Sequence, residues 1–447
     1  PYWYAEELLG NGRGVLVPFK NSDAMAKKII DLLDNEGKRV RMRKKAYEFG
    51  RDMVWGSVAE NYCDTYNAAL SEFKESPSVS AGGRIDPSDS LLDLPDVKLD
   101  HLKVMTDDTG IYQHASYTVP NRKFGYTTDD NARATVVALN QWKIFEDKEA
   151  LELLKTYLSF LAYALEQGGK KARNYLTFDR KWKDRGENED PHGRLLWAIG
   201  RLIGESPNES LRAYGNQLFG KAIEPVSDFT SPRAWAFSIL GIRDYLKKFA
   251  GDRNRKLVGE KLADNLLVEL KNNSDDNWIW PEDSVTYENA RLPEALIAWG
   301  RLTSNDEMKN WGLKSLRWLI ELQQGSEAGQ LSLIGNDGWL IRGEKKADFD
   351  QQPVEVGGLI SASCEAYDLT GDPYFLDTIY AGFNWFLGRN DLGIPLYDFR
   401  TGGCKDGLHP SRVNQNEGGE SLVSWLLSLQ RMYSLLGEFK KDSLGPD

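Results

Sequence analysis

The sequence predicts a mainly α protein, of which the larger part is an (α/α)6 toroid built from six helical hairpins. Six segments each open with polar, often acidic residues and continue with small and apolar residues at helical spacing. Between these segments lie amphipathic helices with charged faces. A helix that is apolar nearly all round is buried on both faces. We therefore expect the first set of helices inside and the second set outside.

The expected inner helices begin near Thr127, Asn188, Thr230, Thr286, Asp348 and Asn414. The expected outer helices span 147–165, 209–223, 254–271, 305–322 and 372–387, and residues 94–107 could supply a sixth. Small residues on the inner segments, such as Gly193 and Gly357, would permit close packing. The alternative is an irregular helical array or an open solenoid, which would use more uniform repeats and a shorter period.

The first part of the chain, residues 1–72, is expected to be a small α/β unit. Residues 13–19, RGVLVPF, are typical of a short strand, and a helix capped by Ser22 or Asp23 should follow. Two further helices are expected before residue 72. One strand and three helices cannot bury a proper core alone. Residues 73–96 are rich in Ser, Pro, Gly and Asp, which predicts a linker, and the toroid should occupy 97–447.

The segment PYWYAEELLGNGRGVLVPFKNSDAMAKKIIDLLDN, together with RMRKKAYEFGRDMVWGSVAENY, resembles the C-terminal tail of a GT-B (group 1 type) glycosyltransferase, a Rossmann-like half of such an enzyme. The resemblance implies a parent protein with a missing N-terminal transferase domain. The acidic donor-binding motif of that family would lie upstream of Pro1. A nucleotide sugar would therefore bind only in the missing transferase part, and no cofactor is expected in this chain. With the low cysteine count, the resemblance also implies a cytoplasmic location.

Composition narrows the possible partners. The formal net charge is -11, whereas a nucleic-acid groove or an anionic membrane would favour a positive surface. No apolar run approaches the roughly 18 residues of a membrane span. Four His and three widely separated Cys make a metal site or a disulfide framework unexpected. The 14 Trp and 19 Tyr suit sugar rings, whose apolar faces stack on aromatic planes.

The inner helices of such a toroid point the same way, so their polar N-terminal ends converge on one pocket. Carboxylates, amides, arginines and tryptophan around a closed cavity would suit an oligosaccharide or other glycoside. The expected substrate-binding residues are Tyr126, Asn131, Arg133, His192, Arg194, Arg233, Trp280, Tyr287, Glu288, Asn289, Arg291, Gln351, Gln352, Asp406, His409, Asn414, Asn416 and Glu417. For Trp280 the alternative is core packing, and for His192 it is a structural role in the turn.

Sugar chemistry needs a pair of carboxylates from different sides of the pocket. Asp129 and Asp130 are the first candidates, because two adjacent acids at a helix start include one more than a cap requires. Glu355, Glu294 and Glu420 compete for the second role, because an acid inside a buried helix is costly without a function or a partner. The alternative is structural: caps and helix-dipole effects for the aspartates, and buried arginine pairs for the glutamates.

The starts GYTTDDNARA, DQQPVE and NQNEGGES resemble those of toroidal glycoside hydrolases and of the N-acylglucosamine epimerase superfamily, and the domain found behind GT-B modules in some bacterial carbohydrate-locus proteins. The resemblance implies a domain that cleaves or rearranges a glycoside. The epimerases use paired histidines, and this chain offers only His101, His114, His192 and His409. A glycan-binding module that positions an acceptor for the transferase half, or a structural partner of it, stays open.

Overall fold

The computed structural model describes residues 3–50, 94–327 and 329–444, with a few residues between 53 and 66. The chain divides into two compact units, residues 1–84 and 85–447. Most of the expected linker, residues 73–93, lies outside the described residues. No helix among the described residues is long and apolar enough to cross a membrane.

The first unit contains α1 (Trp3–Leu9), α2 (Ser22–Asp34) and α3 (Glu36–Gly50). The strand expected over 13–19 is absent from this described stretch, because no second strand is there to accept its hydrogen bonds. The cap of α2 was also assigned to the wrong residue, since the side chain of Asn21 accepts the bond from the Ala24 N–H. No described residue of α2 or α3 is buried, so this unit has no core of its own there.

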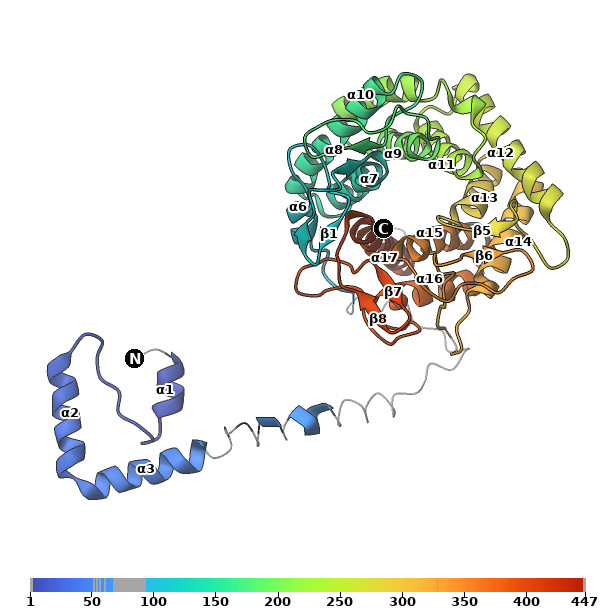
Figure 1. The fold of residues 1–447 in the computed structure, drawn as a ribbon. Helices are drawn as coiled ribbons and strands as arrows, with labels where there is room; N and C mark the ends of the chain where they lie inside the picture. Colours follow the sequence, from blue (N-terminus) through green and yellow to red (C-terminus); the bar gives the residue numbers. More distant parts are fainter. Residues whose placement is uncertain are drawn as a thin grey trace. The chain divides into compact units, whose positions relative to one another are not determined.

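The second unit is a closed ring of six inner helices surrounded by outer helices (Figure 1), which confirms the predicted (α/α)6 toroid. Each inner helix packs against the next, and the last returns to the first, which excludes an open solenoid. The inner helices are α7 (Thr128–Phe145), α9 (Asp190–Glu205), α11 (Pro232–Lys248), α13 (Arg291–Thr303), α15 (Pro353–Thr370) and α17 (Gly419–Leu444).

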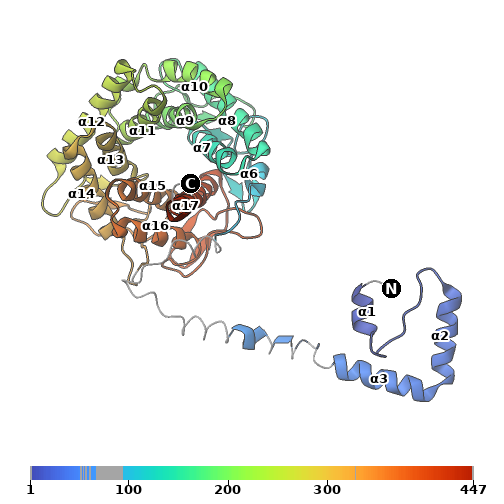
Figure 2. The same ribbon diagram turned by 180° about the vertical axis from the view of Figure 1, so that it is seen from behind.

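The outer helices each cover one inner helix, and the view from behind shows the same double ring (Figure 2). They are α8 (Lys148–Gln167), α10 (Glu209–Ala222), α12 (Arg253–Asn273), α14 (Asp306–Leu322) and α16 (Pro373–Phe386), with the short α6 (Asp100–Val104) against α17. Asparagine or aspartate caps start α8, α10, α12, α14 and α16, as local sequence predicts.

Close contact between α9 and α11 requires glycine. A Cβ on Gly200 would lie 2.1 Å from the carbonyl oxygen of Gly241, far inside van der Waals contact. A Cβ on Gly193 would lie 2.9 Å from the carbonyl oxygen of Ala234. The two helix backbones can come into contact only because glycine has no side chain at these positions, and this contact allows dense packing of the inner ring.

Among the described residues, four short antiparallel strand pairs lie in the connections near the N-terminal ends of the inner helices. The pairs are β1 (Ala115–Ser116) with β2 (Val119–Pro120), β3 (Tyr126–Thr127) with β4 (Tyr175–Leu176), β5 (Ser284–Val285) with β6 (Leu340–Ile341), and β7 (Gly407–His409) with β8 (Arg412–Asn414). Strand β3 leads directly into α7, and its partner β4 brings Asn174 and Tyr175 beside the start of that helix.

Candidate functional site

A cavity of about 300 Å³ lies at the N-terminal ends of the inner helices. Its wall holds four carboxylates, two arginines, two tyrosines, a tryptophan and several amides. The lining residues are Asp129, Arg133, Asn174, Tyr175, Asn188, Asp190, Arg194, Tyr287, Glu288, Trp339, Gln352, Val354 and Glu420. They come from α7, α9, α15, α17 and the loops between, so the predicted convergence of helix starts occurs.

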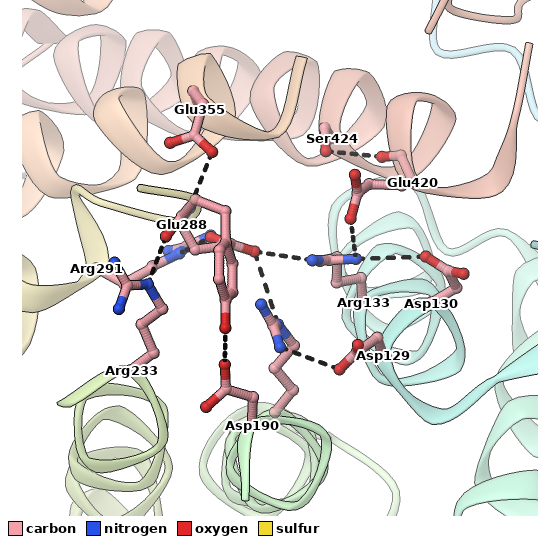
Figure 3. A network of polar contacts seen from close by, with 12 residues as sticks. Asp129, Asp130, Arg133, Asp190, Arg233, Glu288, Arg291, Glu355, Glu420 and Ser424 are labelled. Atoms are coloured by element: carbon pink, nitrogen blue, oxygen red, sulfur yellow. Dashed lines mark hydrogen bonds and ion pairs between the residues drawn. The ribbon is translucent and has the colours of Figure 1, made fainter. Parts of the chain in front are cut away.

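Arg133, one turn inside α7, is the central cation of this site (Figure 3). Its Nη1 atom lies 3.3 Å from Asp130 Oδ1 and 3.1 Å from Glu420 Oε2, so two carboxyl groups share one nitrogen. Its Nη2 atom donates to Glu288 Oε1 at 3.0 Å. Arg133 is buried, so these carboxylates compensate the cost of removing its charge from water.

Glu288 is the central anion. It accepts hydrogen bonds from Arg133 and from Arg291 Nε, the latter at 3.3 Å, and Arg194 Nε lies 3.8 Å away. Burial raises the pKa of Glu288, but the three guanidinium groups outweigh burial and lower that pKa to about 2. Glu288 is therefore ionised at neutral pH. Its backbone is left-handed, with φ 49°, which is strained for a residue with a side chain.

Glu355 holds that strained backbone in place. Its Oε1 accepts the N–H of Glu288 at 2.9 Å and its Oε2 accepts the N–H of Asn289 at 3.3 Å. Pro353 starts α15 and sets Glu355 in its first turn. Burial and the nearby charge of Glu288 raise the pKa of Glu355 to about 8. Glu355 was predicted as a catalytic acid, and it lies behind the cavity wall, where it supports Glu288.

The two adjacent aspartates of α7 have different environments. Asp129 lines the cavity, with its side chain 26% exposed, and its Oδ1 accepts from Arg194 Nη1 at 3.1 Å. Asp130 is buried, and the hydroxyl of the N-cap Thr127 donates to its Oδ2 at 2.6 Å. Burial raises the pKa of Asp130 to about 7 against the opposing effect of Arg133, and the charge of Glu420 adds to the rise. Asp130 thus keeps its proton close to neutral pH.

Other predicted residues support the cavity from outside its lining. Arg233 donates from Nε to the carbonyl of Tyr287 at 2.7 Å and pairs with Glu282, which fixes the backbone beside Glu288. Asn131 accepts the N–H of Ile111, and Tyr126 donates its hydroxyl to Asp107. The Asn289 side chain is fully buried and has no hydrogen bond within the described part of the chain.

Several predicted residues lie away from the 300 Å³ cavity, among them Trp280, His192 and Glu294. Trp280 is fully buried beside Trp318, so the core alternative holds. His192 accepts the Ala172 N–H and hydrogen-bonds the Ala222 carbonyl, and burial lowers its pKa to about 4.

Glu294 is the third. It accepts from Arg291 Nη1 at 2.7 Å and from the Ser361 hydroxyl at 2.8 Å. It lines a second cavity and not the first.

The residues predicted just before α17 make their contacts outside the 300 Å³ cavity. Asp406 accepts the Gly418 N–H at 2.8 Å, and burial raises its pKa to about 6. His409 Nδ1 lies 4.0 Å from Asp350 Oδ1.

The other three contact either their own loop or segments distant in the sequence. Asn414 accepts the Asn416 N–H, and Asn416 in turn accepts the Tyr117 N–H. Glu417 accepts from the Thr401 hydroxyl. Gln351 also lies behind the cavity wall, where its side-chain oxygen accepts a hydrogen bond from the N–H of Leu333.

Sequence reasoning missed Asn174 and Tyr175, because they precede no inner helix and reach the cavity only through pairing of β4 with β3. Trp339 lies in the Gly-rich segment 335–340, whose glycines were the available signal. Within the described residues, no cluster of three or more His, Cys, Asp or Glu side chains could hold a metal ion. None of the four histidines, all of them described, lines the 300 Å³ cavity.

Comparison with known proteins identifies the fold. No family model and no curated protein matches the sequence. The cellobiose 2-epimerase of Bacillus thermoamylovorans B4167 superposes with a TM-score of 0.59 at 12% identity, covering 77% of this chain and 97% of that chain.

A D-mannose isomerase gives a TM-score of 0.58 at 11% identity, over 75% of this chain and 94% of that one. The GH76 α-mannanase of Bacteroides thetaiotaomicron gives 0.54 at 12% identity, over 76% and 95%. At such low identity the likeness concerns the fold, and the chain therefore carries the (α/α)6 toroid that these sugar-processing proteins share.

Proposed function

We propose that the toroid is a glycoside-cleaving enzyme that works with the carboxylates of the 300 Å³ cavity. The observation that carries the proposal is the approach of Asp129 and Glu420 to one cavity from the neighbouring helices α7 and α17. Their side chains are 26% and 45% exposed there, so a substrate can reach both. Glycoside cleavage requires two such groups, one that donates a proton and one that attacks or activates water.

The protonation state of Asp130 changes the charge around this pair. It shares Arg133 Nη1 with Glu420, and its pKa of about 7 keeps it protonated in mildly acidic solution. When Asp130 loses its proton, a third negative charge joins Glu288 and Glu420 around one guanidinium. Two neighbouring carboxyl groups in different environments are a common way to obtain an acid and a base from one residue type.

The structural neighbours support a carbohydrate substrate and suggest the first one to test. One neighbour is an α-1,6-mannanase of Salegentibacter, whose variant with two consecutive aspartates replaced by asparagine is described as inactive and as bound to α-1,6-mannotriose. Asp129 and Asp130 are consecutive in this chain and open an inner helix. The absence of histidine from the described cavity lining favours cleavage by carboxylates over epimerisation by paired histidines.

The test is an end-product screen with manno-, gluco- and galacto-oligosaccharides of varied linkage, α-1,6-mannotriose included. Asp129→Asn and Glu420→Gln should each lower the rate about 10²–10⁴-fold, the usual contribution of a positioned acid or base. Glu149→Gln is the matched control, since Glu149 is an exposed first-turn acid on the neighbouring helix α8. Equal activity of Asp129→Asn and the parent would refute the assignment.

A second candidate function is a non-catalytic glycan-binding module that positions an acceptor for a transferase. One observation favours it: each cavity carboxylate already has a partner, Asp129 with Arg194, Glu288 and Glu420 with Arg133, and Asp190 with the Tyr287 hydroxyl. Saturable binding of an oligosaccharide in calorimetry, with no product over the whole panel, would favour this function. The GT-B resemblance of residues 1–72, the transferase parent and the cytoplasmic location stay predictions.

A further inference from the structure

A second and larger cavity, of about 860 Å³, lies toward the C-terminal ends of the same inner helices. All six inner helices contribute to its wall. At its inner end it reaches Arg291 and Glu294, whose ion pair of 2.7 Å separates it from Glu288 and the first cavity. Its volume is in the range of cavities that hold small organic ligands.

Basic side chains outnumber acidic ones in this second cavity. Beyond the Arg291–Glu294 pair, its lining includes six basic and three acidic side chains, and Asp244, buried behind the wall, adds a fourth carboxylate. The basic ones are Lys143, Arg201, Arg243, Lys247, Arg301 and Arg431.

Each carboxylate of this cavity therefore contacts more than one basic side chain. Glu205 contacts Lys143 at 2.8 Å, Arg201 at 2.9 Å and Lys247 at 3.8 Å. Glu365 contacts Arg243 at 3.0 Å and Arg301 at 3.4 Å. Asp244 is also shared, by Lys247 at 2.8 Å and by Arg243 Nε at 2.9 Å, so six basic side chains are balanced by only four carboxylates.

Helix-end electrostatics accounts for only part of this set. A cation in the last turn of a helix offsets the partial negative charge of its C-terminus. Lys143, Lys247 and Arg301 occupy such last turns. Arg201 and Arg243 lie outside the last turns of α9 and α11, and they face the same cavity.

Gln430 supplies an independent indication of a ligand. Its side chain is fully buried and lines the cavity. Its amide nitrogen donates to the Val137 carbonyl at 3.0 Å and to Gln141 Oε1 at 3.2 Å, while its own Oε1 accepts no hydrogen bond. A buried acceptor without a donor is costly, and a ligand hydroxyl would supply that donor.

We propose that this second cavity binds a sugar phosphate. The phosphate oxygens accept from the basic side chains, for which guanidinium groups have matching geometry. A sugar hydroxyl donates to Gln430 Oε1. This binding site is separate from the carboxylate cavity, and the proposal holds whether or not the first cavity cleaves a glycoside.

The test is calorimetry on the full chain with inorganic phosphate, with the 1- and 6-phosphates of glucose, mannose and galactose, and with the uncharged sugars. At least one sugar phosphate should bind more tightly than inorganic phosphate and than its own sugar. Lys247→Gln and Arg301→Gln should each weaken that binding about tenfold, the effect of losing one charge-assisted hydrogen bond. Both side chains are nearly half exposed, so folding should survive.

Arg317→Gln is the matched control, because Arg317 lies on outer helix α14 and pairs with Asp372 outside the cavity. Its binding should equal that of the parent. The proposal is overturned if no sugar phosphate binds, if none binds more tightly than inorganic phosphate, or if binding is lost in Arg194→Gln and kept in Arg301→Gln. The last outcome would place the anion in the first cavity.

Discussion

At the N-terminal end of the inner helices, four carboxylates line a cavity of about 300 Å³, whereas at the C-terminal end basic side chains outnumber acidic ones around about 860 Å³. The same six helices build both ends. Negative side chains are favoured near helix N-termini and positive ones near C-termini. Individual acids differ in burial: Glu288 at the N-terminal end is buried, while Asp368 at the C-terminal end is 29% exposed. A toroid of parallel inner helices thus provides two chemically opposite cavities.

Removing the central anion of the N-terminal end should have the largest effect on stability. Glu288→Ala removes the buried anion that Arg133 and Arg291 share, and leaves each of them one buried acid, Asp130 and Glu294 respectively. Breaking a buried ion pair costs about 3–5 kcal/mol. Urea unfolding should show a loss of this size in the free energy of unfolding. A loss under about 1 kcal/mol would mean that water reaches these arginines.

Replacing Glu355 by glutamine should have the next largest effect. The new amide must present an N–H₂ group to one of the two backbone N–H donors of Glu288 and Asn289. One hydrogen bond is lost and two donors face each other, which should cost about 1–3 kcal/mol. Any catalytic rate should fall with it, because the left-handed backbone of Glu288 loses its support.

Glu365→Gln is the control for this variant, on the same helix but at the C-terminal end, where Arg243 and Arg301 are its partners. It should leave the catalytic rate unchanged. A rate that falls equally in both variants would indicate a general loss of structure, and the positioning role of Glu355 would then be wrong.

The pH dependence of stability should come from the N-terminal end. Asp130 and Glu355 have pKa values raised to about 7 and 8 in the folded protein, above their unfolded values of 3.8 and 4.5. A raised carboxyl pKa favours folding at low pH, and this contribution disappears as pH rises toward the folded value. Between pH 5 and 7 the parent should lose about 1 kcal/mol or more relative to Asp130→Asn, measured by denaturant unfolding at each pH. If the free energies of unfolding of the parent and of Asp130→Asn change with pH in parallel, the pKa of Asp130 is not raised.

The smallest effect is expected at the C-terminal end. Asp368 is partly exposed and contacts Arg301 at 3.8 Å and Arg431 at 3.3 Å. Exposed ion pairs contribute about 0–1 kcal/mol. Asp368→Asn should therefore change the free energy of unfolding by no more than this, and the change should shrink at high salt. A loss comparable to that of Glu288→Ala would remove the contrast between the ends.

Much of the candidate site followed from local signals. Each predicted inner segment contains the start of an observed inner helix, and the polar residues at these starts include Asp129, Arg133, Arg194, Glu288 and Glu420 of the cavity wall. The position of a residue in its helix did not predict whether it lines the cavity or supports the residues that do. Glu355 and Glu294 each lie in the first turn of an inner helix, yet one supports Glu288 and the other lines the opposite cavity.

By itself, the sequence determined the repeat of apolar and amphipathic helices, most of the outer-helix caps and the gathering of polar residues at one end, because these depend on neighbours within a few turns of the chain. Tertiary structure alone decided which carboxylate meets which arginine, such as Arg133 with Glu288 and Glu420. It also decided that Asp130 is buried beside the partly exposed Asp129, and that Asn174 reaches the site across a strand pair. Partner choice and burial depend on residues far apart in sequence, whose approach is set only when the ring closes.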